Sequence, residues 1–177
     1  KARAFTDTAV ISICRVSGEG WDRKCTLENK QEEDSVFERG DFYLTNAEIA
    51  MVEKVKATFP KVVVVMNVGG MVDTQWFKED TAIDAVLMAW QGGMEGAMAL
   101  ADIICGDVTP SGKLADTIAT SYNSYPCKDD FWESFQHIYY SDDIYVGYRY
   151  FETIPGAKDY VRFPFGFGLS YTSFEIS

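Results

Sequence analysis

Apolar runs alternate with polar or amphipathic segments along the first two thirds of the chain. Three of the runs have the composition of strands, at 8–15, 61–67 and 82–90. The middle run holds four consecutive valines, which is typical of a strand buried on both faces in a parallel sheet. Helices are predicted at 47–58, 73–80 and 95–105, the second of them short. Because strands and helices alternate, the pattern predicts an α/β fold with a mostly parallel sheet.

Local signals mark the ends of two predicted helices. Thr45 precedes the first helix as its N-cap, and Glu48 lies in the first turn. Pro60 ends that helix because a proline cannot continue it. Gly106 follows the last helix in the place of a C′ residue, where glycine adopts a left-handed conformation at little cost.

A long polar loop, 16–45, follows the first predicted strand, and loops of this length are often functional. Its first part reads Ser-Gly-Glu-Gly at 17–20, so Glu19 is flanked by glycines that leave its side chain unshielded. In open α/β sheets ligands bind at the carboxyl ends of strands, and a carboxylate there can act as a general acid or base. Spacing alone favours the alternative, a solvated charged loop.

Residues 121–177 differ from the rest, because they are rich in Tyr, Phe, Asp, Pro and Gly. We expect these aromatic side chains to cover the sheet and seal an interface, since aromatic residues dominate core and interface energetics. A stacked aromatic sugar site is the alternative. The chain is therefore interpreted as one domain, 1–177, with a sheet-helix core at 1–120 and an aromatic-rich tail at 121–177 that packs on it.

Composition excludes several functional classes. The net charge of −11 opposes binding to nucleic acid phosphates, and no apolar run is long enough to span a bilayer. One histidine and four cysteines without a Cys-x-x-Cys pair argue against a metal site. The Gly-Met-Glu-Gly segment at 93–96 fits neither phosphate-loop motif, and we expect no cofactor.

The cysteines bear on the compartment. Cys14 falls in a predicted strand and Cys105 late in a predicted helix, so both are expected to be small buried residues. Cys25 and Cys127 fall in loops and are able to pair in an oxidising compartment, but free thiols are favoured. The compartment stays open between the cytoplasm, which is favoured, and a secreted or periplasmic location.

Four separated motifs resemble glycoside hydrolase family 3, the β-glucosidase family, from about residue 8 to the end. They are Ser-Gly-Glu-Gly at 17–20 with Asp-Arg at 22–23 and Gly-Asp-Phe-Tyr-Leu at 40–44, Pro-Ser-Gly-Lys-Leu at 110–114, the aromatic segment at 140–150, and Phe-Gly-Phe-Gly-Leu-Ser-Tyr-Thr at 165–172. Any one of them is weak evidence, but four in the family's order are strong evidence.

The resemblance implies a three-layer α/β sandwich that, with a TIM-like barrel, forms the active site of a retaining, exo-acting β-glycosidase. The barrel supplies an aspartate nucleophile, and the sandwich supplies the acid/base, which is Glu19 here. Asp22 and Arg23 match the same motif and are candidates for orienting Glu19 or binding substrate. The alternative for both is a salt bridge that only shapes the loop. The implied substrates are β-linked oligosaccharides or aryl glycosides with a terminal glucosyl residue.

The chain also departs from the family pattern. It lacks the barrel, the nucleophile's usual setting, and the strand-helix units that normally begin the sandwich domain. We therefore expect a piece of a larger protein that is inactive alone and meets its barrel in the same polypeptide or an associated chain. Two other hypotheses are a non-catalytic carbohydrate-binding or scaffold domain of the same fold and a flavodoxin-like nucleotide-binding domain, which the missing phosphate loop disfavours.

Overall fold

The computed structural model describes residues 1–20, 23, 36–130, 136–173 and 175. The chain divides into two compact units, Lys1–Leu100 and Ala101–Ser177. Helices of the 3-10 type are short, at η1 (Ala2–Ala4), η2 (Tyr122–Ser124), η3 (Asp143–Tyr145) and η4 (Ala157–Tyr160).

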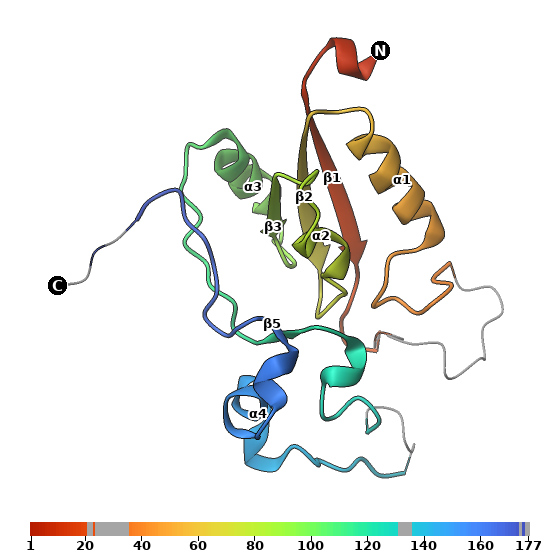
Figure 1. Cartoon of the computed structure of the whole chain (residues 1–177), viewed down its shortest axis with the longest axis vertical. Helices are drawn as coiled ribbons and strands as arrows, with labels where there is room; N and C mark the ends of the chain where they lie inside the picture. Colours follow the sequence, from red (N-terminus) through yellow and green to blue (C-terminus); the bar gives the residue numbers. More distant parts are fainter. Residues whose placement is uncertain (21–22, 24–35, 131–135, 174, 176–177) are drawn as a thin grey trace. The chain divides into compact units, whose positions relative to one another are not determined.

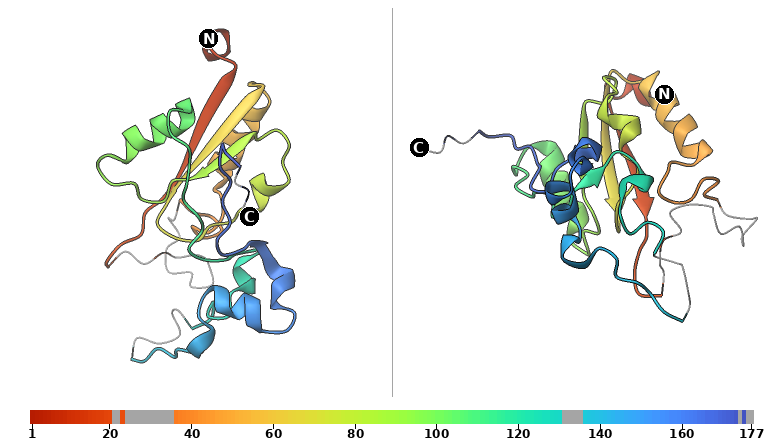
Figure 2. Two further views of the ribbon diagram at one scale, coloured as in Figure 1. Left: turned by 90° about the vertical axis from the view of Figure 1, so that its left-hand side faces the viewer. Right: turned by 60° about the horizontal axis from the view of Figure 1, so that its bottom comes forward.

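The first unit is built on a parallel three-stranded sheet (Figures 1 and 2). Its strands are β1 (Thr8–Arg15), β2 (Lys61–Val68) and β3 (Ala85–Met88), adjacent in that order. β1 and β2 pair along their whole length, from Thr8 opposite Lys61 to Arg15 opposite Val68. The predicted α/β class with a mostly parallel sheet is confirmed, and β1 has the predicted bounds.

Burial of the central strand follows its sequence. Val64 and Val65 point to opposite faces of β2, and both are buried, as the valine run predicted. Helix α1 (Asn46–Lys56) packs on the face that carries Val64, where its own Val52 is buried (Figure 1). Val62, Val64, Met66 and Val68 alternate along this face of β2 and are all buried, so the face carries much of the core of the first unit.

The other face of β1 is open, and this corrects the expectation that Cys14 is buried. Alternate residues of the strand point to opposite faces, so Ile11 and Ile13 are buried whereas Val10 is 53% exposed. Cys14 lies on the exposed face and its thiol is free. An apolar run with one open face therefore resembles a fully buried strand in sequence, because Cys and Val occupy both kinds of position.

The helix ends agree with the local signals. Thr45 Oγ1 accepts the Glu48 N–H at 3.1 Å, and Glu48 Oε2 accepts the Thr45 N–H at 2.8 Å, which forms a capping box before α1. Helix α2 (Gln75–Lys78) is a single turn, and α3 (Gly96–Cys105) ends at Gly106, whose φ is +83°. No residue of α3 is buried, so the expectation of a buried Cys105 is wrong.

The second unit contains a short antiparallel pair, β4 (Ile118–Ala119) and β5 (Val161–Phe163), and helix α4 (Tyr148–Thr153). Its small core consists of Ala119, Phe151 and Ala157 with half-buried aromatic and aliphatic neighbours. Phe151 lies edge-on to Tyr125, with the ring centroids 6.0 Å apart. The aromatic content of the tail thus supplies part of the core of this unit.

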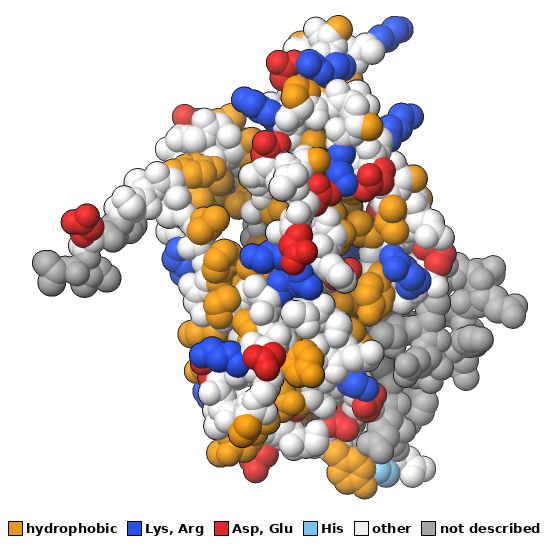
Figure 3. All heavy atoms as spheres, in the orientation of Figure 1, with side chains coloured by type: hydrophobic (Ala, Val, Ile, Leu, Met, Phe, Trp, Pro, Cys, Tyr) orange, Lys and Arg blue, Asp and Glu red, His pale blue; other side chains and the backbone are white. Residues whose placement is uncertain are grey.

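Many apolar side chains of the second unit remain exposed, among them Tyr140, Leu169 and Tyr171. On the face drawn in Figure 3, apolar side chains of the described residues reach the surface among interspersed acidic and basic ones. Within the described part of the chain, no helix has the length and apolar character needed to cross a membrane.

Candidate functional site

The candidate site lies where β1 and β2 end at the same edge of the sheet (Figure 1). The Gly69 N–H donates to the Arg15 carbonyl at 2.8 Å, so the loops that follow the two strands start side by side. Glu19 and Gly20 form a turn in the first loop, with Glu19 exposed and Gly20 at a φ of +72°. The structure thus presents the Glu19 carboxylate to solvent at the carboxyl end of the sheet, where α/β proteins bind ligands.

The loop before Glu19 is held at Ser17. A Cβ atom at Gly69 would lie 2.6 Å from the Ser17 Cβ, so only glycine permits this approach of the two loops. The Gln91 side-chain amide, from the segment after β3, donates to the Ser17 carbonyl at 3.0 Å. Segments that follow all three strands therefore meet at Ser17, two residues before Glu19.

Arg15, the last residue of β1, is a buried arginine whose side chain is only 3% exposed. Its five N–H donors are all matched, at 2.6 to 2.9 Å. The acceptors are the carbonyls of Cys14, Asp41 and Tyr43 and the two carboxylate oxygens of Glu48. Arg15 therefore joins the end of β1 to the segment before α1 and to the first turn of that helix.

Glu48 contacts both Arg15 and the N-cap residue Thr45. Burial raises the pKa of its carboxyl, but hydrogen bonds from Arg15 and Thr45 more than offset that effect, and its pKa lies below the ordinary value. The carboxylate both caps α1 and neutralises the Arg15 guanidinium. A buried ion pair whose remaining donors are all hydrogen-bonded is the arrangement in which burial of charge is tolerated.

Arg23, four residues after Glu19, is also nearly buried, with 8% of its side chain exposed. Its Nε and Nη2 groups donate to the two Asp41 carboxylate oxygens, at 3.0 and 3.1 Å. Nη2 also reaches the Asp41 carbonyl at 3.1 Å, and Nη1 donates to the Met71 carbonyl at 2.6 Å. This arginine connects its own loop to the segment before α1 and to the loop after β2.

Three site residues were predicted from the sequence. Glu19 is exposed in the turn at 19–20, and Arg23 makes the contacts just given. Asp22 lies outside the described residues. Substrate contact by Arg23 stays a prediction, although most of its donors already have protein acceptors. Sequence reasoning missed Arg15 and its ion pair with Glu48. Two charged residues in apolar or motif settings, Arg15 and Asp41, were the available signal.

No group of three or more His, Cys, Asp or Glu side chains is arranged to hold a metal ion in the described part of the chain. Of the two loop cysteines considered for pairing, Cys127 carries a free thiol in the structure, and Cys25 lies outside the described residues. Burial, reinforced by the neighbouring Asp142 carboxylate, raises the pKa of the Cys127 thiol to about 11.

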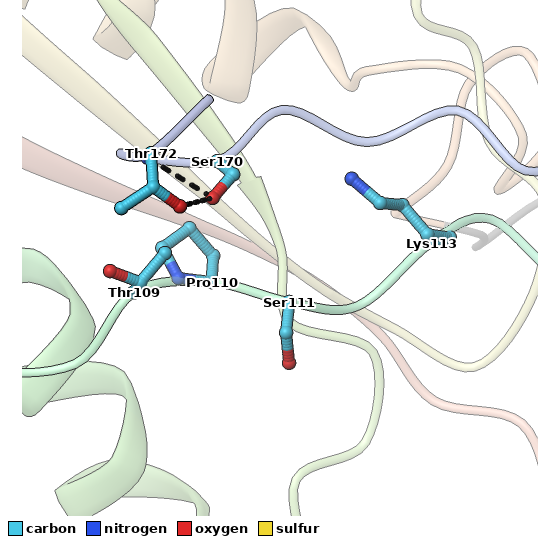
Figure 4. Close-up of a pocket in the computed structure, with 6 residues that line it drawn as sticks. All are labelled: Thr109, Pro110, Ser111, Lys113, Ser170 and Thr172. Carbon is cyan, nitrogen blue, oxygen red and sulfur yellow. Dashed lines mark hydrogen bonds between the residues drawn. The ribbon is translucent and has the colours of Figure 1, made fainter. Parts of the chain in front are cut away.

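Two of the sequence motifs meet in the second unit. A pocket of about 300 Å³ is lined by Thr109, Pro110, Ser111, Lys113, Ser170 and Thr172 (Figure 4). Backbone hydrogen bonds of 2.8 Å join Leu114 to Phe167 and Gly166, and the Lys113 ammonium donates to the Gly168 carbonyl. A Cβ atom at Gly168 would lie 2.6 Å from the Gly112 carbonyl oxygen. These motif residues therefore hold two distant segments together.

Comparisons with known proteins cover nearly the whole chain. The model of the glycosyl hydrolase family 3 C-terminal domain matches residues 1–171. Beta-glucosidase A of Butyrivibrio fibrisolvens is 56% identical over 99% of this chain and 22% of that protein. An exo-α-(1→6)-L-arabinopyranosidase of Bifidobacterium longum is 38% identical over 82% of this chain and 18% of that protein. The crystal structure of a beta-glucosidase from Paenibacillus barengoltzii superposes with a TM-score of 0.80 at 43% identity, over 97% of this chain and 17% of that one.

Proposed function

Because the chain belongs to glycosyl hydrolase family 3 and matches its C-terminal domain over residues 1–171, we propose that it is the acid/base domain of a longer β-glucosidase. The resemblance seen in the motifs is confirmed by these matches. The proposed whole enzyme is retaining and exo-acting, and it releases terminal β-linked glucosyl residues. A barrel domain outside this chain supplies the nucleophilic aspartate.

The observation that carries the proposal is the placement of Glu19. Its carboxylate is exposed on a glycine-flanked turn, at the edge of the sheet where the strands end. Fixed contacts hold the loop on both sides of the turn, at Ser17 and at Arg23. A carboxylate that is accessible to substrate yet carried by an anchored loop suits proton transfer, which needs a group within hydrogen-bond reach of the reacting oxygen.

In the proposed mechanism two carboxyl groups act in turn on the glycosidic bond. The nucleophile attacks the anomeric carbon while Glu19 gives its proton to the leaving oxygen, and a covalent glycosyl-enzyme forms. Glu19, now ionised, takes a proton from water, and that water releases the sugar with retained configuration. In retaining enzymes the two carboxyl groups are about 5 Å apart, so the partner domain must bring its aspartate to within that distance of Glu19.

The choice of glucose as the sugar rests on the relatives' names. The relatives include beta-glucosidases and an arabinopyranosidase, so closely similar domains occur in enzymes for different sugars. We assign the glucosyl specificity because two relatives that are more than 40% identical to this chain, from Butyrivibrio fibrisolvens and Ruminococcus albus, are both beta-glucosidases. Proton donation to the leaving oxygen is common to these reactions, and the acid/base role does not depend on the sugar.

The test uses Glu19→Ala in a full-length protein that carries this chain. With an activated aryl β-glucoside, we expect the variant to form the glycosyl-enzyme but to turn over slowly, because no base activates water. Azide needs no such base, so it should restore turnover and yield a β-glycosyl azide. Wild-type behaviour of Glu19→Ala would contradict the proposal and favour a scaffold or binding domain.

Glu95→Ala is the matched control. Glu95 is also an exposed glutamate near glycines, in the segment that follows β3. We expect this variant to retain wild-type turnover and to show no response to azide. If azide instead restores a defective Glu95→Ala variant, the acid/base is on the loop after β3, and the assignment to Glu19 is wrong.

A further inference from the structure

Two arginines, at equal sequence distances before and after Glu19, both donate hydrogen bonds to Asp41. Arg15 lies four positions before Glu19 and Arg23 four positions after it. Arg15 Nε donates to the Asp41 carbonyl at 2.7 Å, and Arg23 Nη2 donates to the same oxygen at 3.1 Å. The segment that carries Glu19 is therefore a loop whose two ends are tied to a common point.

Neither arginine has the freedom expected of a ligand-binding side chain. All five N–H donors of Arg15 have protein acceptors, and four hydrogen bonds occupy the Arg23 guanidinium. Asp41 is itself nearly buried, with 12% of its side chain exposed, and its carboxylate faces Arg23. Planar, bidentate contacts of this kind fix direction as well as distance.

We infer that Asp41 is a positioning residue that sets the place of the Glu19 carboxylate through Arg15 and Arg23. The inference rests on the proposed acid/base role of Glu19 and extends it to residues that do not touch substrate. Glycines on both sides of Glu19 allow many conformations of the turn. The arginine contacts supply the restraint that the turn itself lacks.

A conservative substitution at Asp41 tests the side-chain part of this arrangement. Asp41→Asn keeps the backbone carbonyl that both arginines share and one side-chain oxygen for Arg23. It removes the negative charge and replaces the second oxygen with an N–H group, which faces the donating Arg23 Nε. The bidentate contact is lost, and the segment after Glu19 is expected to shift. A displacement of about 1 Å in a catalytic group costs up to about 100-fold in rate.

A displaced acid lowers kcat/KM by a factor that depends on the substrate's leaving group, whereas a less stable fold lowers it equally for all substrates. A poor leaving group needs the proton in the first step, whereas an activated aryl leaving group needs little protonation. The value of kcat/KM reports this first step for each substrate. Loss of folded protein lowers kcat/KM for all substrates by the same factor, so the ratio between substrates identifies mispositioning.

The matched control is Asp80→Asn in the same full-length protein. Asp80 also pairs with a cation, Lys56 at the last turn of α1, and its other oxygen accepts the Ala82 N–H at 2.9 Å. The substitution is the same and breaks an ion pair in the same unit. We expect it to leave the ratio between substrates unchanged.

The experiment measures kcat/KM for cellobiose and for 2,4-dinitrophenyl β-glucoside in wild type, Asp41→Asn, Asp80→Asn and Glu19→Ala. We expect Asp41→Asn to lose about 10- to 100-fold on cellobiose and less than about 3-fold on the activated glucoside. If the Asp41→Asn protein does not fold, the Arg23→Lys variant is used in its place. Lysine keeps a positive charge opposite the Asp41 carboxylate, but its single ammonium group cannot also reach the Met71 carbonyl. The same leaving-group dependence is expected for that variant.

The two proposals fail in different ways. The positioning role would be overturned if Asp41→Asn, or Arg23→Lys in its place, lost kcat/KM equally on both substrates, which is the pattern expected of Asp80→Asn. The acid/base role would still stand in that case if azide rescued Glu19→Ala. Wild-type activity of Glu19→Ala would overturn the acid/base assignment, and the positioning role with it. A leaving-group-dependent loss in the Asp41 or Arg23 variant, alongside azide rescue of Glu19→Ala, would support both.

Discussion

Arg15 and Glu48 form a bidentate ion pair, with Nη1–Oε1 and Nη2–Oε2 distances of 2.8 and 2.7 Å. The pair joins the last residue of β1 to the first turn of α1, although 33 positions separate the two residues. The same glutamate caps the helix at Thr45. One carboxylate thus sets where α1 begins and how it is attached to the end of the strand that leads to Glu19.

Removal of this carboxylate should destabilise the fold strongly. We expect Glu48→Ala to lower the free energy of unfolding by about 3 kcal/mol or more, because it leaves the Arg15 guanidinium buried without a counter-charge. Urea denaturation monitored by circular dichroism measures the change. Glu53→Ala is the control, since Glu53 is on the same helix but mostly exposed, and we expect a change within about 0.5 kcal/mol. Equal effects of the two substitutions would contradict the structural role of the pair.

The ion pair should also make stability depend on pH in the acid range. The pKa of Glu48 in the folded chain lies below its ordinary value of 4.5, so the folded state favours the ionised carboxylate. Its contribution is therefore complete above the unfolded value and is lost as pH falls through the folded pKa. We expect the stability difference between wild type and Glu48→Gln to be constant above about pH 5.5 and to shrink below about pH 4.5. A difference that stays constant to pH 3 would contradict the assignment.

Gly69 should resist substitution for steric reasons alone. Gly69→Ala would place a methyl group 2.6 Å from the Ser17 Cβ and 2.9 Å from its backbone nitrogen, so one loop must move. We expect a loss of about 1–3 kcal/mol in unfolding free energy and a drop in activity of a full-length protein. Gly96→Ala is the control, because a Cβ there meets no atom within 4 Å and alanine favours the helix. A Gly69→Ala protein as stable and active as the control would show that the two loops are not tightly packed.

The Cys127 thiol should react slowly in the native protein. Its pKa is raised from 9.0 to about 11, mainly by burial, so near pH 8 the thiolate fraction is about 100-fold lower than in the unfolded chain. We expect alkylation by iodoacetamide, followed by peptide mass spectrometry, to be slower by a similar factor in native protein than in urea. The exposed Cys105 is the internal comparison and should show a much smaller difference. Equally fast alkylation of native and unfolded Cys127 would contradict its burial.

The sequence by itself determined the local elements and the family. The apolar run 8–15 and the valine-rich run after Pro60 predicted two strands that the structure places in a parallel sheet. Thr45 and Glu48 marked the start of α1 because an N-cap involves residues only three positions apart. These signals are readable because the interactions that produce them are local and periodic.

Only the tertiary structure decided which residues meet. The convergence of Arg15 and Arg23 on Asp41 spans 26 and 18 positions, and it depends on how the segment before α1 packs at the end of β1. The exposure of Cys14 likewise depends on which face of β1 receives α1, and both faces carry apolar residues. Neither outcome has a periodic signature, because each is set by packing between segments that are distant in sequence.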